Sequence, residues 1–154
     1  MKSISVYFLP IMRIFTLLFF CFFISTVQAQ DEPEQLIFIE NMPVHKGCAK
    51  IKSKLEKQKC TEEKVTEFIK KNTVYPKKAN AAKLYGYVEV KYIIGEDGLV
   101  IKNETEVLAG FSGKDAELYN NEAIRVINRL PALIPASNDD TFYKVMYTQR
   151  VHFD

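Results

Sequence analysis

The stretch YGYVEVKYIIGEDGLVIKNETEVL, residues 85–108, has the pattern of a β-hairpin. Its first half alternates apolar residues with mostly polar ones, which is typical of a strand with one buried face; the apolar positions are Val88, Val90, Tyr92 and Ile94. Residues 95–98, Gly-Glu-Asp-Gly, supply the backbone conformations that a tight reversal needs. The chain then returns with Leu99, Ile101 and Val107 on one face. Because a lone hairpin is marginal in water, flanking segments must cover its apolar face.

Two amphipathic helices are predicted, one before and one after the hairpin. The first begins with Thr61 as its N-cap and ends in lysines that suit the helix dipole; its apolar stripe is Val65, Phe68 and Ile69. The second covers residues 115–129, and its apolar face consists of Tyr119, Ala123, Val126, Ile127 and Leu130. Shorter helices are expected over residues 49–57 and, after Pro76, over residues 77–84.

A closing strand is predicted over residues 142–153, after a turn at residues 137–140. Its apolar face is Tyr143, Val145, Tyr147, Val151 and Phe153. The order helix, hairpin, helix, strand predicts an α+β domain of two layers. A helical crossover after the hairpin places the last strand beside the first, so we expect a three-stranded antiparallel sheet of order 2-1-3 with helices on one face.

The first 29 residues have the features of a cleaved signal peptide. Two basic residues, Lys2 and Arg13, precede an apolar run at residues 14–24, and the segment ends at Ala29 in a small-x-small pattern. The alternative interpretation is an uncleaved membrane anchor, although about twenty apolar residues are needed to span a bilayer. We expect cleavage after Ala29, and therefore a mature protein that does not span the membrane.

The leader also bears on the start codon and on the charge of the mature protein. The n-region is long, so Met12 is an alternative start to Met1. Cys21 lies within the apolar run and is removed with the leader. Loss of the leader leaves 19 basic and 19 acidic residues. Because these charges balance, the mature chain has no excess of positive charge with which to bind nucleic acid or an anionic membrane.

Two cysteines remain after the leader, Cys48 and Cys60. An even number of cysteines in an exported protein predicts a disulfide. An alternative is a metal site that includes His45, but it has no convincing fourth ligand and lacks the usual short cysteine spacing. We therefore predict a Cys48–Cys60 disulfide in an N-terminal extension, residues 30–60, ahead of a domain at residues 61–154.

Sequence motifs for catalysis are missing from the mature chain. It contains no nucleophile elbow, zinc-protease motif, phosphate-binding loop or dinucleotide fingerprint. His152 lies on the polar face of the last strand, and Asp139 and Asp140 suit a turn. We expect a protein that is not an enzyme, with no catalytic residues, no cofactor and no metal.

A spaced pattern of about a dozen residues resembles the C-terminal domain of the TonB family. It covers roughly residues 62–154, and the segment before it is similar to TonB-like periplasmic proteins of the Bacteroidota. The pattern consists of Tyr75-Pro76-x-x-Ala79, Gly86-Tyr87-Val88-x-Val90, Asp97-Gly98-x-Val100, Glu122-Ala123-x-Arg125-Val126, Leu130-Pro131 and Phe153.

The resemblance implies a periplasmic domain that takes part in transmembrane transport. Members of the family carry energy from an inner-membrane motor to outer-membrane transporters, and their domain holds an extended peptide beside its last strand. The resemblance therefore implies an extended peptide, or a TonB-box-like segment, of an outer-membrane protein as the partner. Its expected contacts are Tyr143, Lys144, Val145, Met146, Tyr147, Thr148, Gln149 and Arg150.

The chain departs from the family pattern in three ways. Leu133 stands where the family usually has tryptophan, and Gln149-Arg150 stand near a frequent proline. The segment between the leader and the domain has about thirty residues, which reach roughly 100 Å when fully extended. It also lacks the long proline-rich stretch of energy transducers, so a module that is not coupled to the motor is compatible with the sequence.

Two functions follow from a free edge on the closing strand. The first is recruitment of an extended peptide by strand addition. The alternative is a structural envelope protein whose edge pairs with a second copy, which would make a homodimer. Proline at Met146 and at Tyr147 should distinguish the two edges of the strand: one substitution unfolds the domain, and the other only prevents binding.

Overall fold

The computed structural model describes residues 38–77 and 85–153. The expected leader, and all of the expected helix at residues 77–84 except its first residue, lie outside these described residues. The described residues form one compact unit.

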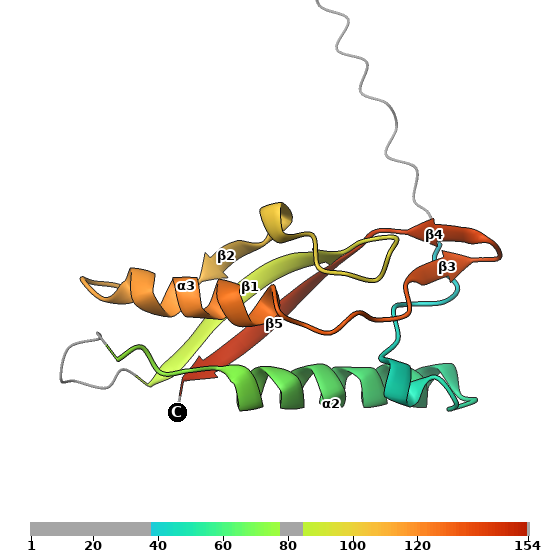
Figure 1. Cartoon of the computed structure of the whole chain (residues 1–154), viewed down its shortest axis with the longest axis horizontal. Helices are drawn as coiled ribbons and strands as arrows, with labels where there is room; N and C mark the ends of the chain where they lie inside the picture. The colour runs from blue at the N-terminus through green and yellow to red at the C-terminus, as the bar shows by residue number, and fades with distance from the viewer. Residues whose placement is uncertain (1–37, 78–84, 154) are drawn as a thin grey trace, which may run out of the picture. The chain divides into compact units, whose positions relative to one another are not determined.

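A three-stranded antiparallel sheet forms the centre of this unit. It consists of β1 (Gly86–Ile94), β2 (Glu106–Ala109) and β5 (Val145–Phe153) in the order β2-β1-β5. Helix α3 (Ala116–Ile127) connects β2 to the later strands (Figure 1). The predicted α+β class and the predicted strand order 2-1-3 are confirmed.

The hydrophobic core lies between one face of this sheet and the helices. The four alternate residues predicted for β1 are all buried, as are the five predicted for the second helix, of which Leu130 lies just after the end of α3. Helix α2 adds two further core residues, Val65 and Ile69. The other face of the sheet carries the intervening residues, and its Tyr87 is 42% exposed.

Helix α2 (Lys54–Asn72) is longer than the sequence predicted. Ser53 is its N-cap and accepts a hydrogen bond from Glu56 N–H, so the predicted cap at Thr61 is wrong. No glycine or proline lies between Ser53 and Asn72, and the helix therefore continues through Thr61. The predicted helix at residues 49–57 is wrong in its first part, because a 3₁₀ turn, η1 (Lys46–Cys48), is followed by non-helical chain up to Ser53. Its last part, residues 54–57, is helical and forms the beginning of α2.

The returning hairpin strand differs from its prediction in register and length. Gly95 N–H donates to Leu99 O at 2.8 Å and Ile101 N–H donates to Ile93 O at 2.9 Å. Val100 consequently lies opposite the core residue Ile94 and packs against the core, whereas Leu99 is 48% exposed. A 3₁₀ turn, η2 (Lys102–Glu104), then interrupts the pairing before β2 begins.

The predicted closing strand at residues 142–153 is divided into two strands. Its beginning belongs to β4 (Thr141–Tyr143), which pairs with β3 (Ala136–Asn138) around a turn in which Asp139 has φ 47°. Only β5 pairs with β1, because β1 ends at Ile94, opposite Val145. The predicted turn is correct for Asp139 and Asp140, but Ser137 and Asn138, which were predicted as part of it, belong to β3.

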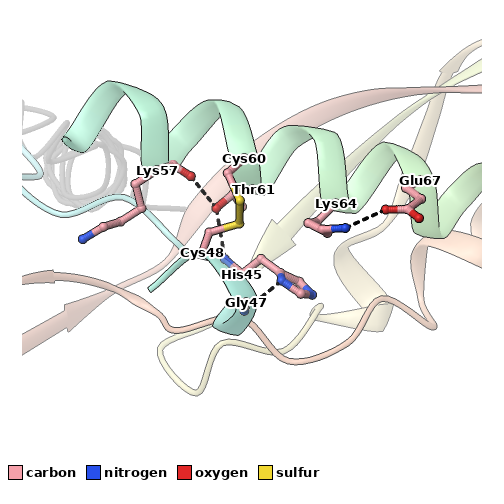
Figure 2. The surroundings of a disulfide bond; sticks show 8 residues. All are labelled: His45, Gly47, Cys48, Lys57, Cys60, Thr61, Lys64 and Glu67. Atoms are coloured by element: carbon pink, nitrogen blue, oxygen red, sulfur yellow. Dashed lines mark hydrogen bonds and ion pairs between the residues drawn. A yellow bond between two sulfur atoms is a disulfide. The ribbon is translucent and has the colours of Figure 1, made fainter. Parts of the chain in front are cut away.

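The predicted disulfide is present and joins Cys48 to Cys60 of α2 (Figure 2). It ties the η1 turn to the helix. Beside it, the Thr61 hydroxyl donates to Lys57 O at 2.8 Å and accepts from His45 N–H at 3.1 Å. His45 uses its Nδ1 to accept from Gly47 N–H. The cysteine sulfurs and the imidazole are thus engaged in structural contacts.

Reduction of this disulfide should destabilise the protein. Closing a 13-residue loop stabilises a fold by about 3 kcal/mol through the entropy of the unfolded chain. We expect the reduced protein, or the Cys48→Ser/Cys60→Ser double variant, to unfold at a lower urea concentration. Its free energy of unfolding in water should be lower by about 3 kcal/mol. The unreduced protein should be two hydrogen atoms lighter by mass spectrometry, and two titratable thiols in the native protein would contradict the assignment.

An ion pair between Glu122 and Arg125 of α3 holds the chain that follows α2 in place. Arg125 of α3 contacts both carboxylate oxygens of Glu122 and also donates to Asn72 O at 2.8 Å. Glu122 accepts from Val74 N–H at 2.7 Å. Burial alone would raise the pKa of Glu122, but the bonds from Arg125 and Val74 outweigh it and lower the pKa below 4.5.

Glu122→Gln should therefore destabilise the domain in a pH-dependent way. Because the pKa is lower in the folded state, this stabilisation is present above about pH 4.5 and is lost as the pH falls through the folded pKa. We expect a cost of about 1–2 kcal/mol at pH 7 that shrinks below pH 4.5. Urea unfolding across this range is the measurement, and Glu117→Gln, an exposed glutamate of the same helix, is the control. A loss of unfolding free energy that stays constant with pH would contradict a stabilising role for the charge of Glu122.

Candidate functional site

The main-chain groups of β1 alternate between its two neighbours. Ile93 O accepts from Ile101 N–H, so the polar main-chain groups of Ile93 point toward the returning hairpin strand. The residues one step away, Tyr92 and Ile94, therefore direct their N–H and C=O groups toward β5. In the register of β1 and β5, Tyr92 lies opposite Tyr147 and Ile94 lies opposite Val145.

The other edge of β5 is open. Since Val145, Tyr147 and Gln149 direct their main-chain groups toward β1, the intervening residues direct theirs away from the sheet. These edge residues are Met146, Thr148, Arg150 and His152, and their side chains are all exposed. Within residues 38–77 and 85–153, no backbone partner pairs with their N–H groups. Of their carbonyls, Arg150 O accepts a long bond from Gln149 Nε2 at 3.4 Å.

The structure separates the eight residues expected to contact a partner. Tyr143 ends β4 and Lys144 lies between the two strands, so neither is part of the open edge. Val145, Tyr147 and Gln149 face the core side of β5, and Met146, Thr148 and Arg150 face the solvent side. His152 was not among the expected contacts, but its main-chain groups also point outward and extend the open edge by one residue. This follows because main-chain groups along β5 alternate in direction.

The charge of Arg150, which lies beside this edge, is paired on the solvent face of the sheet. Arg150 Nε donates to Glu89 at 3.2 Å, and its guanidinium lies 4.7 Å from the centroid of the Tyr87 ring. The Tyr87 ring also contacts the His152 ring, with centroids 5.7 Å apart. Charged side chains often protect a strand edge from pairing. Here the one arginine of β5 lies over β1 instead, which leaves the edge accessible.

A pocket of about 180 Å³ lies between α2 and β5. Its walls come from α2, from the core side of the sheet, and from the β5 edge; the lining residues are Gln58, Thr61, Glu62, Val65, Tyr92, Leu133, Tyr147, Thr148 and Gln149. Burial raises the pKa of Tyr147 to about 12 and raises that of Tyr92 still further, with a contribution from Tyr147. Both phenols are therefore uncharged at neutral pH.

The α2 wall of this pocket was not predicted. Thr61 was interpreted as a helix cap, although Thr61, Val65 and Ile69 recur at i, i+4 and i+8 and hence share one helical face. That spacing could have predicted a helix that continues through Thr61. The sequence could not place α2 beside β5, because the two segments are more than 70 residues apart in the chain.

Other classes of site find no support in the part of the chain that the structure describes. There, no cluster of three or more histidine, cysteine, aspartate or glutamate side chains could hold a metal ion. Within the same residues, no helix has the length and apolar character needed to cross a membrane.

Comparison with known families gives one match. The family model described as Gram-negative bacterial TonB protein C-terminal matches residues 71–154, which is more than half of the chain. The match contains the whole sheet, α3 and the small hairpin, whereas most of α2 and the disulfide precede it. No curated protein and no solved structure matches the chain.

Proposed function

The chain belongs to the TonB C-terminal family, and from this premise we propose that it is a periplasmic module that recruits an extended peptide to the open edge of β5. Domains of this family are non-enzymatic protein-interaction domains of the cell envelope and interact with outer-membrane proteins. The peptide is proposed to be a segment of an outer-membrane transporter or of another envelope protein. A cleaved leader at residues 1–29 would bring the module to the periplasm.

The observation that supports this proposal most is the open edge. From Met146 to His152 the edge presents an outward N–H and C=O at every second residue, over about 20 Å of strand. An added peptide strand satisfies such groups with main-chain hydrogen bonds, while its alternate side chains contact the two faces of the sheet. The engaged Arg150 places no free charge across the approach of the peptide.

The structural alternative uses the same edge. If β5 pairs with β5 of a second copy, the outward groups are satisfied in a homodimer rather than by a peptide. The two functions differ in oligomeric state. A monomer that binds peptide supports recruitment, whereas a dimer that does not bind peptide supports a structural role.

Thr148→Pro should abolish recruitment without unfolding the domain. Proline removes the outward donor in the middle of the edge, and the ladder to β1 does not use this donor. Thr148→Val is the matched control, because it changes the side chain and retains the N–H. The measurement is a pull-down from an envelope extract with each purified variant, together with light scattering for oligomeric state. Equal recovery of partners by the proline variant and the wild type would reject the edge mechanism.

A further inference from the structure

We propose that the pocket between α2 and β5 selects the peptide by accepting one large apolar side chain and rejecting acidic ones. This inference rests on the proposed recruitment at β5 and adds to it the chemistry of the ligand. The proposed occupant is a leucine, methionine or phenylalanine side chain of an extended peptide that is neutral or basic at that position.

The position of the pocket connects it to the open edge. Tyr147 and Gln149 line the pocket from the core side of β5. The side chain of Thr148 belongs to the opposite face, so Thr148 lines the pocket with its main chain at the outer edge of the strand. The pocket therefore begins where an added strand would lie.

The pairing geometry determines which peptide residue enters. A residue opposite Tyr147 or Gln149 shares their face of the sheet and so points toward α2. In an added strand that runs antiparallel to β5, the residues opposite Tyr147 and Gln149 would form non-hydrogen-bonded pairs, because Tyr147 and Gln149 direct their main-chain groups to β1. Such pairs have the closer Cα separation, about 4.5 Å, and the closer side chains. A side chain at this peptide position is thus held against the pocket.

The lining selects for apolar character. Val65, Leu133 and Tyr92 are buried core residues, and the phenols of Tyr92 and Tyr147 are neutral. Among the described residues that line the pocket there is no lysine, arginine or histidine, and Glu62 is the one charged side chain. An acidic peptide side chain would meet buried apolar residues and the like charge of Glu62, both of which oppose binding, and the polar groups of Gln58 and Gln149 that it would also meet are neutral. A volume of about 180 Å³ suits one large side chain rather than a second element of structure.

The wall that α2 contributes is held in place before a peptide arrives. Thr61 lies within this wall and accepts the hydrogen bond from His45 N–H, and Cys60, the residue before it in α2, is tied to the preceding segment by the disulfide (Figure 2). A preformed wall reduces the ordering cost of binding. Residues 58–65 precede residue 71, where the family match begins, so this wall comes from outside the matched region.

The first test is selection of random heptapeptides displayed on phage against the purified, oxidised protein. Enriched peptides should share an alternating pattern with leucine, methionine or phenylalanine at one fixed position and should lack acidic residues there. One enriched peptide is then synthesised with leucine, alanine or aspartate at that position, and dissociation constants are measured by fluorescence anisotropy. We expect alanine to weaken binding about tenfold relative to leucine, and aspartate to bind more weakly than alanine.

The second test reverses the charge of the wall. Glu62→Lys should strengthen binding of the aspartate peptide about two- to fivefold relative to wild type, because an ion pair replaces a repulsion near the surface. Glu63→Lys is the matched control, since it makes the same change in net charge one residue away and does not line the pocket. Its affinity for the aspartate peptide should stay close to that of wild type.

The outcomes separate this inference from the proposed function. In one outcome, Thr148→Pro abolishes peptide binding, but Glu62→Lys and Glu63→Lys have the same affinity for the aspartate peptide, and the alanine peptide binds as well as the leucine peptide. The pocket is then not a selectivity site, whereas recruitment at the edge of β5 is supported. If no peptide is enriched, or if Thr148→Pro binds the selected peptides as wild type does, edge recruitment fails and the pocket proposal fails with it.

Discussion

Tyr147→Pro should unfold the domain, whereas Thr148→Pro, one residue further, should leave it folded. The Tyr147 amide points toward β1, where Tyr92 lies opposite, and the two rings stack with centroids 5.8 Å apart. Proline there removes a ladder hydrogen bond between β5 and β1 and leaves the acceptor on β1 unpaired, at a cost of about 1–3 kcal/mol before the steric clash of the proline ring is added. Loss of the half-buried phenol adds to this cost. Together they approach the 5–15 kcal/mol that stabilises a typical domain.

Tyr147→Ala separates the two contributions, because it removes the ring and retains the amide. We expect the alanine variant to remain folded with a lower melting temperature, and the proline variant to lose cooperative unfolding by circular dichroism. Met146→Pro should behave like Thr148→Pro, because both amides point outward. If Tyr147→Pro folds and the outward variants do not, the assignment of the open edge is reversed.

Gly98→Val should destabilise the domain by more than about 3 kcal/mol. Gly98 has φ +78°, a conformation that costs an L-residue roughly 1–2 kcal/mol. A Cβ atom at this position would also lie 2.0 Å from Leu133 O. Leu133 N–H donates to Gly98 O at 2.9 Å, so relieving the clash would break the contact between the hairpin turn and the chain that follows α3. Thermal melts should show a decrease of about 4–8 °C for each kcal/mol.

Two other glycines provide matched controls for this substitution. Gly113 has φ +98° and open space around its Cβ position, so Gly113→Val measures the conformational cost alone. At Gly110 the nearest atom is the side-chain oxygen of Asn120, at 2.8 Å, which can move more easily than backbone. We expect both variants to melt above Gly98→Val. Equal melting temperatures for all three would show that close packing at Leu133 contributes nothing.

Local pattern was sufficient to predict much of this fold. Alternation identified β1 and its core face, and 3.6-residue spacing identified the face of α3, because burial of an apolar surface imposes these periods on any sequence. The helical crossover after the hairpin then predicted that the last strand lies beside the first. The disulfide was predicted from the two cysteines that remain after the expected leader. The errors arose where these signals are weak: Thr61 has the chemistry of a helix cap, and only a continuous i→i−4 ladder shows that the helix passes through it.

The open edge and the pocket depended on contacts between distant segments. In a strand, side chains and main-chain groups both alternate with a period of two, so the sequence shows that Tyr147 faces the core but not which neighbour its amide meets. That choice follows from the side on which β1 lies, and hence from the pairing of Ile93 with Ile101 across the hairpin. The pocket likewise exists because α2 packs beside β5, and long-range packing of this kind leaves no local periodicity from which it could be predicted.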